Sequence, residues 1–233
     1  MILFRYFIIL SLFCAPLAAH AARPMVTDDA RLTKGGSCQV ETWIKAYSGG
    51  HEFWALPACN PFGNFELTLG TAASKLSGET TSHDYIFQAK TLFKELNPDG
   101  WGFGVAIGTA QHENKLHPGP NGLGSTYVYF PISHSFLEDQ LITHINFGYT
   151  HFKETSKESL TWGVGSEYKL RENLLYVLES FGDQHTSAYV QTGLRYSVVP
   201  DIFQIDTTVG RQFNKDDSDW LSIGIRYTPD KLF

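Results

Sequence analysis

The sequence predicts an all-β protein, a single twelve-stranded antiparallel transmembrane β-barrel. Three observations lead to this class: side chains alternate between apolar and polar along most of the chain, short and longer connections alternate, and the chain begins with an export signal. In the stretch AYVQTGLRYSVV (residues 188–199), Leu194 and Tyr196 share one face, and Gln191 and Arg195 share the other. This pattern is typical of a strand that lies between an apolar and an aqueous environment.

The first 21 residues have the three parts of a secretory signal peptide. Arg5 supplies the positive start, YFIILSLFCAPLA supplies a short apolar core, and AHA (19–21) supplies a small-residue cleavage site. We expect residues 1–21 to be removed, residues 22–37 to form an N-terminal segment in the periplasm, and residues 38–233 to form the barrel. The expected location is the outer membrane of a Gram-negative bacterium.

The alternating stretches define the strands. Each is about as long as the 9–11 residues that a tilted membrane-spanning strand needs, and no stretch has a convincing helical period. The expected strands are 38–47, 51–59, 63–72, 83–94, 100–111, 123–132, 141–152, 159–170, 173–181, 187–198, 202–211 and 219–228.

The connections between these strands predict the orientation. If both chain ends lie in the periplasm, the turns on that side are mostly tight: 60–63, 97–100, 133–140, 171–172 and 200–201. The connections on the other side are generally longer and more polar: 111–122, 153–158, 182–187 and 214–219, with the very short turn at 48–49 as the exception. Short periplasmic turns, longer outer loops and an even strand number are typical of outer-membrane barrels.

The two faces of each strand predict which side contacts lipid. In strand 100–111, Trp101, Phe103 and Ile107 share one face, and Gly102 and Gly104 share the other. A soluble periplasmic β protein, the alternative, would place the large residues inside and a charged face outside. Because the second face is mostly glycine, small polar residues and isolated charges, we expect the apolar face to point outward.

Two cysteines follow the signal peptide, and an even number in an exported protein indicates a disulfide. Folding the first hairpin about residues 48–49 places Cys38 opposite Cys59 and Lys45 opposite Glu52. The chain has 18 Lys and Arg against 24 Asp and Glu, and loss of Arg5 leaves 17 against 24. This acidic balance disfavours nucleic acid as a partner, and we expect neither a metal site nor a cofactor.

Parity places a set of charged side chains inside the barrel. These are Glu41, Lys45, Glu52, Glu66, Lys90, Glu167, Lys169, Glu179, Arg195, Asp206 and Arg226. With Gln204 between them, Arg195, Asp206 and Arg226 are expected to form a rung across three consecutive strands. Such a rung either sets solute selectivity or satisfies polar groups in a narrow lumen, and both roles are compatible.

The motif TDDA (27–30) lies just before the first strand. Asp28 and Asp29 are too few to define a calcium site. We expect them instead to hold the N-terminal segment in the periplasmic mouth as a small plug, through ion pairs with Arg195 or Arg226.

Two parts of the sequence resemble a known family. The start of the mature chain, ARPMVTDDARLTKGGSCQVE (22–41), and the C-terminal stretches WGVGSEYKL, ESFGD and YVQTGLRYSVVPDIFQIDTTVG resemble the "MetA-pathway of phenol degradation" outer-membrane proteins. The resemblance implies a β-barrel that takes up aromatic or other hydrophobic compounds.

The function that fits best is a channel for passive uptake of small solutes, with aromatic or hydrophobic compounds among them. A closed barrel with a structural or surface-interaction role is the alternative. An outer-membrane lipase is a third hypothesis, but no Gly-x-Ser-x-Gly motif occurs, and no serine is evident on the face of His144. We therefore expect no enzymatic activity, and the expected partners are outer-membrane lipids, the barrel-assembly machinery and a small-molecule solute.

Overall fold

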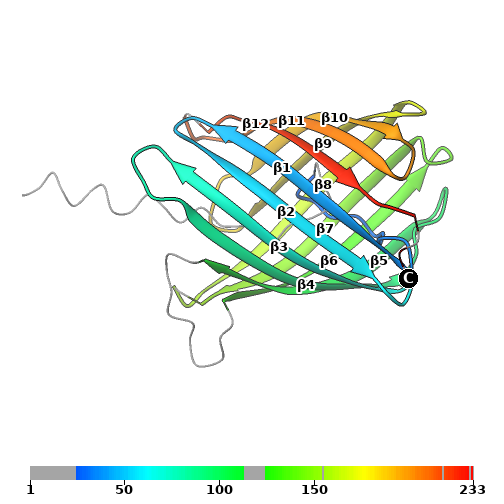
Figure 1. Ribbon diagram of the computed structural model, residues 1–233, viewed down its shortest axis with the longest axis horizontal. Coiled ribbons are helices and arrows are strands. Elements are labelled where there is room, and N and C mark those ends of the chain that lie inside the picture. The colour runs from blue at the N-terminus through cyan, green and yellow to red at the C-terminus, as the bar shows by residue number, and fades with distance from the viewer. Residues whose placement is uncertain (1–24, 113–123, 154, 217, 231, 233) are drawn as a thin grey trace, which may run out of the picture.

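The computed structural model describes residues 25–112, 124–153, 155–216, 218–230 and 232, which form twelve strands closed into one barrel (Figure 1). The predicted signal peptide lies outside the described residues. In chain order the strands are β1 (Ser37–Tyr47), β2 (Gly50–Asn60), β3 (Phe65–Leu76), β4 (Ser82–Lys94), β5 (Trp101–His112), β6 (Ser125–Phe136), β7 (Leu141–Phe152), β8 (Lys157–Arg171), β9 (Leu174–Asp183), β10 (Tyr189–Val199), β11 (Phe203–Gln212) and β12 (Trp220–Tyr227).

Every strand pairs antiparallel with its neighbour in sequence, and β12 pairs with β1 to close the sheet. Because the sheet has no edge, no row of backbone groups is left without partners in lipid. The predicted fold class is therefore confirmed. Within the described part of the chain, no helix is long and apolar enough to cross a membrane.

The two mouths of the barrel differ in the chain segments that form them. Residue 36, Thr228 and the turns after β2, β4, β6, β8 and β10 form one mouth, which we call the C-terminal mouth; the C-terminus lies there in Figure 1. The connections after β1, β3, β5, β7, β9 and β11 form the opposite mouth.

Burial follows the predicted parity. On β10, the side chains of Leu194 and Tyr196 are 41% and 45% exposed, whereas Arg195 between them is 6% exposed and points inward. Apolar side chains such as Ile44, Phe87 and Leu221 cover the outer surface in the same way. The outer surface is therefore apolar and the interior holds the charges, as a membrane barrel requires.

Some strand ends differ from the prediction. The strand β6 continues to Phe136, so the predicted turn at 133–140 is wrong in extent and only residues 137–140 turn. Leu137, Glu138 and Asp139 have positive φ angles of 56°, 55° and 64°, and this tight reversal lets the ladder run further than the polar sequence suggests. The strand β3 likewise begins and ends later than predicted, at Phe65 and Leu76.

The first hairpin has the predicted register. Lys45 lies opposite Glu52, Trp43 opposite Trp54, and Cys38 opposite Cys59. The two cysteines form a disulfide with a Cα–Cα distance of 4.0 Å, on the outward face next to the C-terminal mouth. The bridge fixes the start of β1 to the end of β2.

We predict that peptide mapping without reductant will recover the Cys38 and Cys59 peptides as one linked species. Replacing both cysteines by serine should lower the free energy of unfolding by about 3 kcal/mol, because the bridge closes a loop with a sequence separation of 21 residues. Urea titration of the heat-modifiable gel band measures this change. Free thiols in protein taken directly from the envelope would contradict the prediction.

The outward face also gives a depth-dependent prediction. Leu194→Arg should cost about 2–4 kcal/mol of unfolding free energy in bilayers, because it places a charge near the middle of the lipid. Val198→Arg, on the same face of β10 but near its end, should cost about 0–1 kcal/mol. Equal effects of the two substitutions would show that this face of β10 does not cross the bilayer.

Candidate functional site

Aromatic side chains fill the half of the lumen next to the opposite mouth. The Trp43 and Trp54 rings stack with centroids 5.4 Å apart, and Tyr127 and Tyr129 stack at 6.2 Å. The Lys45 Nζ lies 4.5 Å from the centroid of the Trp220 ring. These rings come from inward positions of β1, β2, β6 and β12.

Residues 25–36, which we call the N-terminal segment, run inside the barrel. Met25 and Ala30 are 4% and 0% exposed. A Cβ atom at Gly163 would press against Thr27, and one at Gly165 against Met25, so these two wall positions of β8 leave room for the segment. The segment therefore lies deeper than the mouth position that the sequence predicted.

Glu179 of β9 holds the start of the N-terminal segment. Its two carboxylate oxygens accept hydrogen bonds from the backbone N–H groups of Val26 and Thr27 at 2.6 and 2.7 Å. Gln191 donates a further hydrogen bond to the same carboxylate. At the other end of the segment, Glu66 accepts from the Thr33 N–H at 2.6 Å.

Asp28 and Asp29 are held by Lys90 of β4. The Lys90 Nζ lies 2.8 Å from Asp28 Oδ2 and 3.7 Å from Asp29 Oδ1, and the Tyr129 hydroxyl donates to Asp28 at 2.7 Å. Burial raises the pKa of Asp28, because it outweighs the opposing effect of the Lys90 charge. Burial also acts to raise the pKa of Asp29, but the charges of Lys90 and Arg31 together outweigh it, so the pKa of Asp29 is lowered. The sequence predicted Arg195 or Arg226 as the partner of these carboxylates and did not identify Lys90 for this role. The alternation of side chains along β4 predicted that Lys90 points inward, but alternation does not predict which residue it contacts across the lumen.

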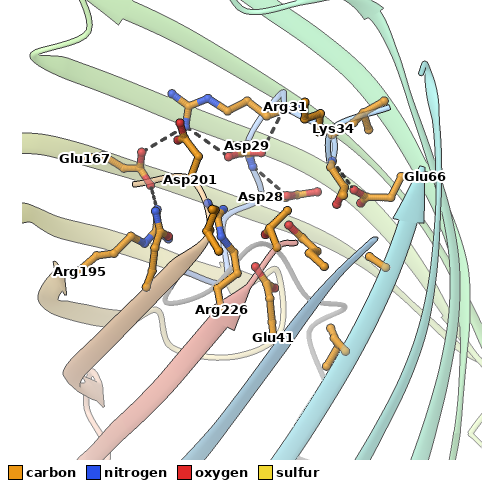
Figure 2. A pocket seen from close by; sticks show the side chains of 18 of the residues that line it. Asp28, Asp29, Arg31, Lys34, Glu41, Glu66, Glu167, Arg195, Asp201 and Arg226 are labelled. Atoms are coloured by element: carbon orange, nitrogen blue, oxygen red, sulfur yellow. Dashed lines mark hydrogen bonds and ion pairs between the residues drawn. The ribbon is translucent and has the colours of Figure 1, made fainter. Parts of the chain in front are cut away.

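A second set of ion pairs joins the segment to β8 and β10. Arg31 Nη1 lies 3.3 Å from Glu167 Oε2, and Arg195 Nη1 lies 2.6 Å from Glu167 Oε1, so Glu167 bridges two guanidinium groups (Figure 2). Asp206 lies directly opposite Arg195 in the register, and Gln204 lies opposite Arg226, as the sequence predicted. What the sequence missed is the bridge through Glu167, because β8 and β10 are separated by β9.

His144 has a serine partner that the sequence did not reveal. Ser133 on β6 lies opposite His144 on β7, and its Oγ is 2.8 Å from His144 Nδ1. The longer β6 brings Ser133 into the ladder, so the predicted lack of a serine on this face is wrong. Ser133 is fully buried, and its Oγ accepts a hydrogen bond from the Ala30 N–H at 2.8 Å.

A cavity of about 770 Å³ lies between the N-terminal segment and the C-terminal mouth. Its lining is mainly charged and polar, and Figure 2 shows Arg195, Arg226, Glu41 and Asp201 among the side chains around it. Eight of the residues that the sequence placed inside the barrel line this cavity: Glu41, Glu66, Lys90, Glu167, Lys169, Arg195, Gln204 and Arg226. Lys45 and Glu52 lie instead near the opposite mouth, where Glu52 accepts a hydrogen bond from the Trp54 ring nitrogen at 3.0 Å.

Within the described part of the chain, no group of three or more His, Cys, Asp or Glu side chains is arranged to hold a metal ion. The charged groups instead bind one another and the N-terminal segment. The arrangement is chemically suited to contact a polar solute in the cavity and to keep the segment in place.

Solved structures with a similar fold are outer-membrane channels. The KdgM porin matches with a TM-score of 0.62 and 11% identity, over 81% of this chain and 98% of that one. The COG4313 outer membrane channel from Pseudomonas putida F1 matches with a TM-score of 0.58 and 10% identity, over 86% and 98%. The CymD monoaromatic hydrocarbon channel matches with a TM-score of 0.50 and 11% identity, over 86% and 89%. At these identities the likeness shows the fold of an outer-membrane channel.

By sequence, no curated protein matches the chain. The resemblance to the phenol-degradation family is not confirmed by a family match. The family that matches covers residues 9–228, nearly the whole chain. The chain therefore belongs to the family described as Uncharacterised conserved protein UCP029691.

Proposed function

We propose that the protein is an outer-membrane channel for small solutes and that its N-terminal segment acts as a plug. The observation that carries the proposal is the position of residues 25–36 inside the closed barrel, between the aromatic half and the cavity. A barrel with only a structural role has no need to hold a chain segment by ion pairs through its centre. The lumen residues Arg195, Asp206, Arg226, Gln204, Glu167 and Glu179 would then contact either the solute or the plug.

The same proposal fixes the orientation and the partners. The C-terminal mouth faces the periplasm, residues 1–21 direct export, and the barrel-assembly machinery inserts the chain into the outer membrane of a Gram-negative bacterium. The apolar outer surface supports a lipid environment, and the short turns at the C-terminal mouth support this orientation.

The solute class depends on which half of the lumen selects it. The resemblance to phenol-degradation barrels and the name of the CymD channel favour aromatic solutes, and the stacked Trp43 and Trp54 rings offer them a surface. The periplasmic half is charged instead. A small solute with both apolar and polar parts suits the two halves together.

A closed barrel with a structural role remains the second candidate, and the aromatic filling favours it. An enzymatic role has less support. The Ser133 hydroxyl has the His144 ring beside it, but it is fully buried and already accepts a hydrogen bond from Ala30, so no substrate carbonyl can reach it while the segment is in place.

Plug removal distinguishes the channel from the structural barrel. Deleting residues 22–36 should raise single-channel conductance in planar bilayers, because it empties the centre of the lumen. Lys90→Met should raise conductance by a smaller amount, since it removes the ion pairs with Asp28 and Asp29 but leaves the hydrogen bonds to Glu179 and Glu66. In the deletion background, Lys90→Met should add little, because the contact it breaks is already gone.

The control for this series is Arg211→Gln, which changes an ion pair with Asp219 that is exposed and lies outside the cavity. Heat-modifiable gel migration confirms that each variant is folded. Unchanged conductance in the deletion variant would remove the plug from the proposal, and a complete lack of conductance in all variants would favour the structural barrel.

Arg195 should also brace the wall. Arg195→Ala removes one of the two cations on Glu167 and should lower the free energy of unfolding by up to about 3–5 kcal/mol, because buried charge is left with fewer partners. Arg211→Ala breaks an exposed pair and should cost less than about 1 kcal/mol. Denaturant titration in detergent compares the two variants, and equal costs would show that the pair of Arg195 with Glu167 does not stabilise the barrel.

A further inference from the structure

Arg226 differs from the other arginines inside the barrel. Arg31 and Arg195 both pair with Glu167, at 3.3 and 2.6 Å. Arg226 lines the cavity and is partly buried, yet it has neither an ion pair within 4.0 Å nor a hydrogen bond with any described residue. A guanidinium group presents up to five N–H donors in a planar fork that fits a carboxylate. Arg226 therefore offers this fork to the contents of the cavity.

A hydrogen-bond acceptor lies beside this arginine. Gln204 is the neighbour of Arg226 in the register of β11 and β12, and it also lines the cavity. Its side chain is 8% exposed, and its Oε1 accepts no hydrogen bond within the described part of the protein, while its nitrogen donates to Ser197. A buried amide oxygen in this state is stabilised by a donor group on a ligand.

Two hydroxyl groups extend the same polar surface. Thr33 of the N-terminal segment and Thr228 at the end of the barrel wall line the cavity, and their buried Oγ1 atoms have no hydrogen-bond partner among the described residues. Hydroxyl groups both donate and accept, so they suit a ligand that carries hydroxyl groups of its own. A hydrocarbon would leave all of these polar groups without partners.

Glu41 is a carboxylate that competes with a bound anion for Arg226. It lies opposite Arg226 in the pairing of β1 with β12, is 3% exposed, and lines the cavity. A carboxylate at this position attracts the guanidinium and repels an anionic ligand. Removing the charge of Glu41 should therefore strengthen the binding of an anion at Arg226 and weaken the binding of a cation.

We propose that the cavity at the C-terminal mouth binds a small hydroxylated carboxylate, with the carboxylate on Arg226 and a hydroxyl group donating to Gln204. The volume of about 770 Å³ is enough for a molecule of the size of a sugar acid. The proposal deepens the channel function by naming its solute class. It rests on that function only in taking the cavity as part of the solute path.

Equilibrium binding to the detergent-solubilised full-length mature protein tests the proposal without requiring conduction. Isothermal titration calorimetry compares D-galacturonate, D-galactose and D-galactosamine, which have similar size and hydroxyl groups but carry a negative, no and a positive charge. D-galacturonate should bind saturably and at least tenfold more tightly than D-galactose. Arg226→Gln should weaken galacturonate binding at least tenfold, Glu41→Gln should tighten it about threefold or more, and Arg211→Gln, at the exposed rim pair, should leave it unchanged.

Heat-modifiable migration verifies the fold of every variant, and Arg226→Lys replaces Arg226→Gln if the latter does not fold, with an intermediate loss of affinity expected. Galactosamine binding more tightly than galacturonate, galactose binding equally well, absence of saturable galacturonate binding, or full affinity in the Arg226 variant would each overturn the proposal. Liposome swelling, measured separately, distinguishes failure of the channel function from failure of the carboxylate site. Galacturonate binding without swelling would refute the channel function alone. Swelling without galacturonate binding would refute the carboxylate site alone.

Discussion

The pairing of every strand with two neighbours is the constraint on which the rest of this structure depends. Backbone N–H and C=O groups find no water in lipid, so the sheet must close, and β12 returns to β1. Closure leaves each inward side chain inside a narrow lumen and each outward one in contact with lipid. Inward charges are stabilised by partners within the barrel, as Lys90 is by Asp28 and Arg195 is by Glu167.

The N-terminal segment supplies many of these partners. Asp28 and Asp29 pair with Lys90, Arg31 pairs with Glu167, and backbone N–H groups of the segment bind Glu179 and Glu66. Segment and wall depend on each other, because removing one leaves buried charge in the other. Near Gly36 the segment is fixed to the wall, where Asn60 binds the Thr33 carbonyl and the disulfide follows at Cys38.

The two halves of the lumen differ in chemistry. Aromatic rings occupy the half near the opposite mouth, whereas charged and polar groups surround the cavity at the C-terminal mouth. Within this cavity Arg195 and Arg31 both pair with Glu167, whereas Arg226 has no ion pair or hydrogen bond with a described residue. A solute that passes through both halves meets stacked rings on one side of the segment and a guanidinium group on the other.

The sequence by itself determined the twelve strands, their faces and the local register, because period-two alternation and short turns constrain each hairpin separately. Cys38 with Cys59, Arg195 opposite Asp206, and Gln204 opposite Arg226 are all neighbours of this kind. Only the tertiary structure decided the contacts across the lumen, such as the ion pairs of Asp28 with Lys90 and of Arg195 with Glu167. The hydrogen bond from the Ala30 N–H to Ser133 Oγ is another contact of this kind. These depend on the curvature of the closed sheet and on the path of the N-terminal segment, and neither leaves a periodic signal in the sequence.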